Sequence, residues 1–102
     1  MARLLVMYNQ PTDPDAFDVY FFSKHVPLLQ QIPGARSWVF SEGPVVAQDG
    51  SKPYHLIAEV VFDSMADLQA GLLTPEGEAA AADFENFAAG GFTAVMYETR
   101  DV

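Results

Sequence analysis

The residues best suited to chemistry lie between positions 17 and 34, where an apolar segment carries one histidine and two prolines. His25 follows Phe21 by four residues, at the edge of the apolar face that a helix over this segment would form. An imidazole at the mouth of an apolar pocket can donate or accept a proton near neutral pH. The alternative is a half-buried histidine that hydrogen-bonds the backbone and fixes the helix end near Pro27. The residues alone leave both interpretations open.

Aromatic side chains supply further candidates for a ligand site. The phenols of Tyr8 and Tyr20 could orient a carbonyl or phenolic ligand while their rings line a pocket. Trp38 and Phe40 suit a flat apolar ligand, and ordinary core packing is the alternative for all four residues. We therefore predict catalytic roles for His25 and Tyr20, and ligand contacts for Tyr8, Trp38, Phe40, Phe21, Met7 and His55.

The residue pattern does not support metal, phosphate-binding or hydrolase chemistry. The chain has no cysteine, and its two histidines are not arranged as HxH or HxxxH, so no metal site is expected. His55 and Glu59 would share one face of a strand, too far apart for direct contact. Gly90-Gly91 is typical of a turn rather than a phosphate-binding loop, and no serine has a base beside it by spacing. We expect no cofactor.

The charge balance narrows the range of partners. The chain has 102 residues and a formal net charge of −9, with only five scattered Lys and Arg side chains. Nucleic-acid phosphates and anionic membranes require clustered positive charge, so neither is expected as a partner. No apolar run is long enough to span a bilayer, and the N-terminus does not resemble a secretory signal. We therefore expect a cytoplasmic protein, which also fits the absence of cysteine.

The elements that would position these side chains alternate along a single domain, residues 1–102. Strands are expected at 3–8, 35–41, 54–62 and 92–99. Helices are expected at 14–30, with a distortion near Pro27, and at 64–73 and 75–87. The predicted N-caps are Asp13, Asp63 or Ser64, and Thr74. The order β-α-β-β-α-β predicts an α+β, ferredoxin-like fold, which is a four-stranded antiparallel sheet with helices on one face.

Both faces of this predicted sheet are apolar. Side chains alternate across a strand, so Leu4 and Val6 would point to one face while Leu5 and Met7 point to the other. Helices can cover only one face, and the other would expose an apolar patch larger than soluble monomers tolerate. We therefore expect a homodimer that pairs the open sheet faces, with about 800 Å² buried per partner. Curled sheets would then form an eight-stranded barrel with room for side chains or one small ligand.

Two short motifs follow one another, His25-x-Pro27-Leu28 near the end of the first expected helix and Ile32-Pro33-Gly34 just after it. Together with Phe17-x-x-Tyr20 and the order of the elements, they resemble the EthD family of the dimeric α/β-barrel superfamily over nearly the whole chain. The resemblance implies the dimeric α/β-barrel architecture and places His25 in the family's motif. Similar small barrels include lactone isomerases, polyketide cyclases, cofactor-free quinol oxygenases and haem-degrading oxygenases. Haem is not expected here, because few basic residues are present to hold its propionates.

Two functions of different classes remain open. The first is a cofactor-independent enzyme, of isomerase, cyclase or oxygenase type, acting in catabolism on a small, apolar, oxygenated molecule. His25 would move a proton while Tyr8 and Tyr20 position oxygen atoms. The second is a non-catalytic homodimer that binds a ligand or acts as an accessory protein. An enzyme needs His25 at a cavity with a second polar group in reach, a carrier needs only the cavity, and a structural dimer would have none.

Overall fold

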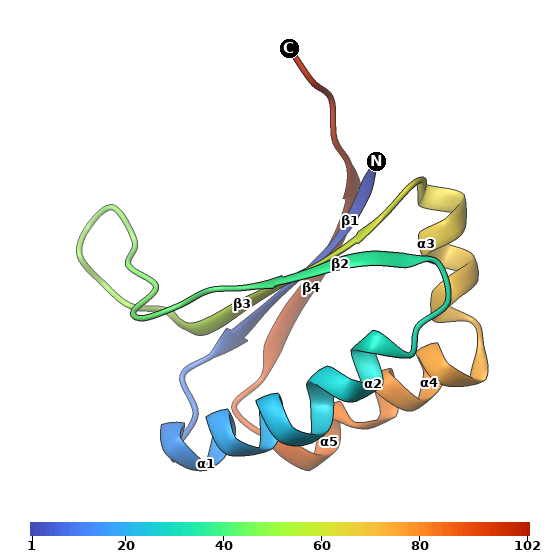
Figure 1. The fold of residues 1–102 in the computed structure, drawn as a ribbon. Helices are drawn as coiled ribbons and strands as arrows, with labels where there is room; N and C mark the ends of the chain where they lie inside the picture. Colours follow the sequence, from blue (N-terminus) through green and yellow to red (C-terminus); the bar gives the residue numbers. More distant parts are fainter.

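Four strands form one antiparallel sheet in the order β2-β3-β1-β4, and every helix lies on the same face of it (Figure 1). The computed structural model describes all 102 residues. The strands are β1 (Ala2–Asn9), β2 (Ala35–Phe40), β3 (Tyr54–Phe62) and β4 (Phe92–Glu98). Both β-α-β units place a third strand between their own two strands, which is the ferredoxin-like arrangement. The predicted fold class is therefore confirmed.

The helical segment between β1 and β2 changes its geometry just before Pro27. It consists of α1 (Pro14–Tyr20), the π-helical turn η1 (Phe21–His25) and α2 (Val26–Gln30). Asp13 caps its start by accepting a hydrogen bond from the backbone N–H of Ala16. At the end of η1, the N–H of Val26 donates to the carbonyl of Phe21, five residues back. Pro27 has no N–H to continue the regular pattern, which explains why the expected distortion occurs here, at the turn that ends in His25.

The second helical segment consists of α3 (Met65–Leu72), α4 (Pro75–Ala82) and the short α5 (Phe84–Phe87). Ser64 and Thr74 cap α3 and α4 with their hydroxyls, as predicted. The two helices approach closely at Gly77, where an added Cβ would lie 2.3 Å from the Gly71 carbonyl oxygen. The helix expected to continue to residue 87 instead breaks at Asp83 and resumes as α5. None of these helices is long and apolar enough to cross a membrane.

The core fills the space between the sheet and the helices. Side chains that are nearly or fully buried there come from the two central strands, β1 and β3, and from the helical segments: Val6, Tyr8, Phe17, Phe21, Leu29, Ile32, Leu56, Val60, Phe62, Leu68 and Ala80. Full burial of one large apolar side chain contributes about 1.5–3 kcal/mol relative to its exposure. This core holds the two helical segments against the sheet and so fixes the positions of the side chains between them.

The opposite face of the sheet carries no helix (Figure 1). Val39 and Val95 on this face are 52% and 41% exposed. The polar groups there include Arg3, whose guanidinium lies 2.9 Å from the Glu59 carboxylate. The uncovered, largely apolar face is thus present as expected, while the pairing of two such faces stays a prediction.

His55 departs from the alternation expected of its strand. The pairing of β1 with β3 shifts by one residue next to Tyr8, which leaves His55 as the extra residue of a β-bulge. Its Nε2 lies 2.7 Å from a carboxylate oxygen of Asp18 on α1, and its ring meets Phe17 edge to face. His55 therefore lies against the helix layer, and its expected place on one sheet face with Glu59 is wrong, because the bulge redirects the side chain.

Candidate functional site

A buried histidine–carboxylate pair joins the two helical segments. His25 is fully buried, and its Nδ1 lies 2.9 Å from a carboxylate oxygen of Asp83, which is 58 residues further along the chain. The other carboxylate oxygen of Asp83 accepts the Tyr20 hydroxyl at 2.7 Å and the Asn86 side-chain amide at 2.9 Å. Asp83 is thus the centre of a network that connects η1 and α1 with the junction of α4 and α5.

Burial and hydrogen bonding act against each other in this network. Burial lowers the pKa of His25, and it outweighs the opposing effect of the Asp83 carboxylate. Burial alone would raise the pKa of Asp83, but the hydrogen bonds from Asn86, Tyr20 and His25 hold that pKa below its ordinary value. A neutral imidazole beside an ionised carboxylate donates its Nδ1 proton to that carboxylate. The unshared electron pair of His25 is therefore on Nε2.

Nε2 of His25 is buried and has no hydrogen-bond partner. Such atoms are rare in folded proteins, because an unpaired buried polar group costs about 1–3 kcal/mol. The ring is surrounded by Phe87, Phe84 and Phe21, with centroid separations of 4.6, 5.2 and 5.6 Å. A base held in one tautomer by a carboxylate, with its free nitrogen enclosed by aromatic rings, can accept a proton from a ligand that reaches it.

An apolar cavity of about 200 Å³ lies next to this network, between the sheet and the helices. The residues that line it are Leu4, Val6, Tyr8, Leu29, Ile32, Ala58, Val60, Leu72, Gly77, Ala80, Ala81, Phe84, Ala94 and Met96. His25 itself is not among them. Phe84 lines the cavity and also packs against the imidazole, so its ring links the cavity with the buried histidine.

Tyr8 is the one residue of the cavity lining that carries a hydroxyl. The residue is almost fully buried, and its ring packs edge to face against Phe17 and Phe21. Burial, and to a lesser extent the charge of Asp83, raise the pKa of the Tyr8 phenol far above its usual value. The hydroxyl therefore stays protonated at neutral pH and can donate a hydrogen bond to an oxygen atom of a ligand.

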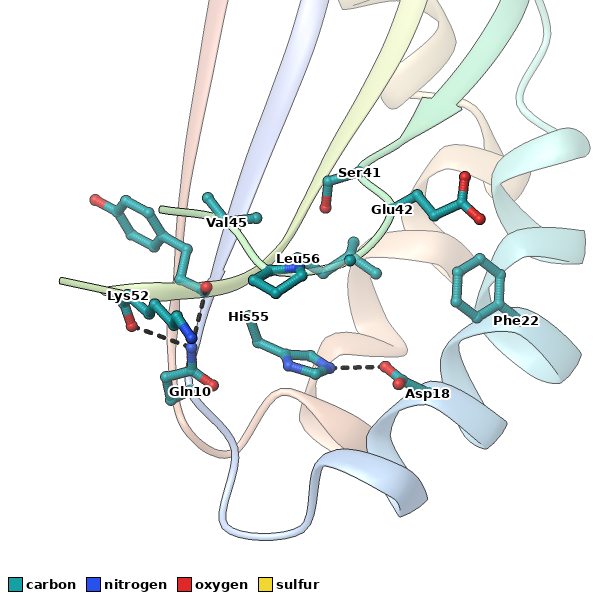
Figure 2. Close-up of a pocket in the computed structure, with 12 residues that line it drawn as sticks. Gln10, Asp18, Phe22, Ser41, Glu42, Val45, Lys52, His55 and Leu56 are labelled. Atoms are coloured by element: carbon teal, nitrogen blue, oxygen red, sulfur yellow. Dashed lines mark hydrogen bonds and ion pairs between the residues drawn. The ribbon is translucent and has the colours of Figure 1, made fainter. Parts of the chain in front are cut away.

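A second pocket, of about 410 Å³, lies at the end of the sheet beside α1 and the loop that follows β2 (Figure 2). His55 and Asp18 belong to its polar lining, which also includes Gln10, Ser41, Glu42 and Lys52, and Figure 2 shows the imidazole turned toward the carboxylate. Gln10 donates its amide to the backbone carbonyls of Lys52 and Tyr54 at 3.0 and 3.1 Å. His55, Asp18 and Gln10 already have partners within the protein, and His25 is absent from the lining. The buried network around Asp83 is therefore the better candidate site.

Four of the predicted site residues gather around this network. His25 and Tyr20 both contact Asp83 directly. Phe21 contacts the rings of Tyr8 and His25, and Tyr8 reaches the cavity. The alternative interpretation of His25, a half-buried histidine that hydrogen-bonds the backbone, is not observed. The partner of His25 is a carboxylate, and the histidine is fully buried.

The other four predicted residues lie apart from it. The Trp38 indole donates to the backbone carbonyl of Leu29, and Phe40 packs edge to face against Phe21 and Phe22. Both belong to the packing between sheet and helices, and neither lines the apolar cavity. Met7 pairs with Ile57 and Thr93 on the helix-free side of the sheet, and His55 belongs to the polar pocket. These four residues therefore do not form a shared site with His25.

Sequence reasoning missed Asp83, Asn86 and Phe84, which complete the site. One signal was available. Asp83 lies three residues after Ala80 and four before Phe87, so it interrupts the apolar face of a helix with an acidic side chain. Carboxylates on such a face are rarely buried without a partner. A search for that partner would have led to the one histidine on the facing helical segment.

Comparisons with known proteins place these residues in a family context. The model of the EthD domain matches residues 9–91, a range that includes both His25 and Asp83. An uncharacterized 11.0 kDa protein of the thcB–thcC intergenic region of Rhodococcus erythropolis is 42% identical over 103 residues, which cover 100% of this chain and 98% of that protein.

Two solved structures share the fold to different degrees. An ethyl tert-butyl ether D (EthD) family protein from Bacillus halodurans superposes with a TM-score of 0.88 and 33% identity over 98% of this chain and 99% of that chain. SnoaB, a cofactor-independent oxygenase from Streptomyces nogalater, superposes in a mutant form with a TM-score of 0.68 and 12% identity. That alignment covers 99% of this chain and 94% of SnoaB. At this identity the likeness to SnoaB shows a common fold.

Proposed function

Because this chain belongs to the EthD family, we propose that it binds a small, apolar, oxygenated molecule and catalyses a proton transfer on it without a cofactor. The resemblance noted in the sequence motifs is confirmed by the family match. One observation carries the proposal: Nε2 of His25 is buried and unpaired while Asp83 holds Nδ1. The fold shared with SnoaB, a cofactor-independent oxygenase, is compatible with chemistry that needs no bound cofactor.

The proposed reaction begins when a ligand in the apolar cavity displaces the Phe84 ring and approaches Nε2 of His25. The imidazole takes a proton from a carbon or hydroxyl that a neighbouring carbonyl makes acidic, and the electron pair moves onto the carbonyl oxygen. Asp83 stabilises the imidazolium, and Tyr8 donates a hydrogen bond to the oxygen that gains charge. Return of the proton to a different atom completes an isomerisation. A positioned base of this kind contributes about 10²–10⁴-fold to a rate.

The test is a screen of lactones, hydroquinones and activated ketones for turnover by the wild-type protein and three variants. His25→Ala and His25→Asn should each lower turnover by at least about 100-fold while the fold is retained. His55→Ala, at the chain's other histidine, is the matched control and should keep near-normal turnover. The proposal fails if both His25 variants retain turnover, or if they lose it only in proportion to the protein that unfolds.

The second candidate function is a non-catalytic ligand-binding homodimer. It is favoured by the enclosure of His25, which is fully buried and does not line the cavity. In that case the His25–Asp83 pair would stabilise the junction of the helical segments and nothing more. Ligand binding that is unchanged in His25→Ala, together with no turnover of any screened compound, would favour this function.

We also propose that two chains pair through the helix-free faces of their sheets. The support is the apolar, uncovered surface that includes Val39 and Val95. Sedimentation velocity at micromolar concentration should show a dimer, and Val95→Lys should give a monomer. Val19→Lys is the control, because Val19 is 70% exposed on α1, in the helix layer. A monomeric wild-type chain, or a Val95→Lys variant that still dimerises, would contradict the pairing.

A further inference from the structure

We infer that the apolar cavity binds one uncharged molecule of about single-ring size and excludes carboxylates and ammonium ions. The inference names the substrate class of the proposed function and rests on it. Three features of the cavity support it: its volume, the side chains that line it, and the place where it reaches solvent.

The volume sets the size of the ligand. The cavity holds about 200 Å³, whereas pockets for drug-sized molecules measure roughly 300–1,000 Å³. An apolar cavity of about 150 Å³ accommodates benzene. Small residues create the space: Gly77, Ala80 and Ala81 on the helix side, and Ala58 and Ala94 on the sheet. One ring with a few substituents fits, and a two-ring system does not without displacement of the walls.

The lining sets the charge of the ligand. No charged side chain borders the cavity, and none of the five Lys and Arg residues of the chain is among its walls. Burial of a carboxylate or an ammonium group without a partner is strongly unfavourable. Asp83 adds a further reason against anions, because its negative charge lies close enough to the cavity residue Tyr8 to affect its phenol.

Tyr8 sets the polar group that the ligand needs. Its hydroxyl is the sole strong hydrogen-bond donor among the side chains of the lining. A carbonyl or ether oxygen can accept from it without a charge on either partner. The ligand that matches the cavity is therefore a neutral cyclic compound with one accepting oxygen.

The cavity reaches solvent beside the edge strand β4, where lining residues are exposed. Ala94 and Met96 line the cavity, and Met96 is 47% exposed. These residues pair with Val6 and Leu4, which point to the helix side of the sheet. A dimer formed through the opposite face would therefore leave this entrance uncovered.

The test uses the methionine methyl groups as probes. The protein contains four methionines, of which Met96 lines the cavity while Met7 lies on the other face of the sheet. Methyl-¹³C methionine labelling and NMR titration at pH 7 would follow cyclohexanone, cyclohexanecarboxylate and cyclohexylammonium. Cyclohexanone should shift the Met96 methyl with saturation and leave Met7 in place, and both ions should bind at least about tenfold more weakly. A carboxylate that binds as well as the ketone, or a ketone that does not move Met96, overturns the inference.

Two substitutions on α4 provide a matched comparison. Ala81 borders the cavity and Ala79 does not, and both are exposed on the same helix. Ala81→Leu should weaken cyclohexanone binding at least about tenfold, while Ala79→Leu should leave it within about twofold. Tyr8→Phe should weaken it about two- to tenfold through the lost hydrogen bond. Equal effects of the two leucine variants would show that the ketone binds elsewhere, and would overturn the inference.

The outcomes separate this inference from the proposed catalysis. If cyclohexanone still binds His25→Ala and no compound is turned over, the inference about the cavity ligand is supported and the proposed catalysis is ruled out. Turnover of a charged substrate that depends on His25 supports the enzyme and overturns the inference about the ligand.

Discussion

Replacement of Asp83 by alanine tests the central contact of the site. The side chain accepts hydrogen bonds from Tyr20, His25 and Asn86. After Asp83→Ala, the Tyr20 hydroxyl and the Asn86 amide can turn to water, because both residues lie at the surface or close to it. Nδ1 of His25 cannot reach water in the same way, because the residue is fully buried.

The expected loss of stability follows from the buried imidazole, which loses its hydrogen-bond partner. A hydrogen bond to a charged group contributes about 1.5–3 kcal/mol, and the small void left by the carboxylate adds to its loss. We expect Asp83→Ala to lower the free energy of unfolding by about 2–4 kcal/mol. For a domain of this length, each kcal/mol corresponds to a shift of about 4–8 °C in Tm. Domains of this kind have about 5–15 kcal/mol of stability, so the variant should still fold at 25 °C.

The assay is urea unfolding at pH 7.5, followed by circular dichroism. Glu85→Ala is the control, because it removes a carboxylate two residues away that is exposed, and it should cost less than about 0.5 kcal/mol. A double-mutant cycle with His25→Ala should give a coupling energy of about 1–3 kcal/mol. The reasoning is refuted if Asp83→Ala is no more destabilising than Glu85→Ala, or if the cycle shows no coupling.

Three further predictions concern pH, helix packing and the second histidine. Burial holds the pKa of folded His25 below its unfolded value of about 6.5, so the unfolded chain takes up the proton first. Stability should therefore fall as pH drops below about 6.5, and His25→Ala should flatten this slope in urea titrations. Gly77→Ala should destabilise by about 1–3 kcal/mol in thermal melts, because its Cβ would meet the Gly71 carbonyl; a stabilised variant would show that the helices separate freely. His55→Ala removes the contact with Asp18 and should leave the NMR titration of the His25 imidazole unchanged, whereas a shifted titration would link the two histidines.

Local signals in the sequence were sufficient to predict the elements of the fold. The four strands, the caps at Asp13, Ser64 and Thr74, and the distortion before Pro27 all occur where the residue pattern placed them. These features depend on residues within a few positions of one another, through side-chain alternation, capping and the missing N–H of proline. Their order along the chain was enough to indicate the ferredoxin-like arrangement and its uncovered sheet face.

The candidate site depended on contacts between residues far apart in the chain. His25 stood out in the sequence, but its partner Asp83 is 58 residues away and is brought close only when the two helical segments pack on the sheet. The same packing set the Trp38 indole against the backbone carbonyl of Leu29, outside the lining of the apolar cavity. A single β-bulge turned His55 toward α1, because one inserted residue reverses the direction of a side chain. Alternation and capping specify where an element begins and which way it faces, whereas a cavity or a buried hydrogen-bonded pair forms only when several elements pack together.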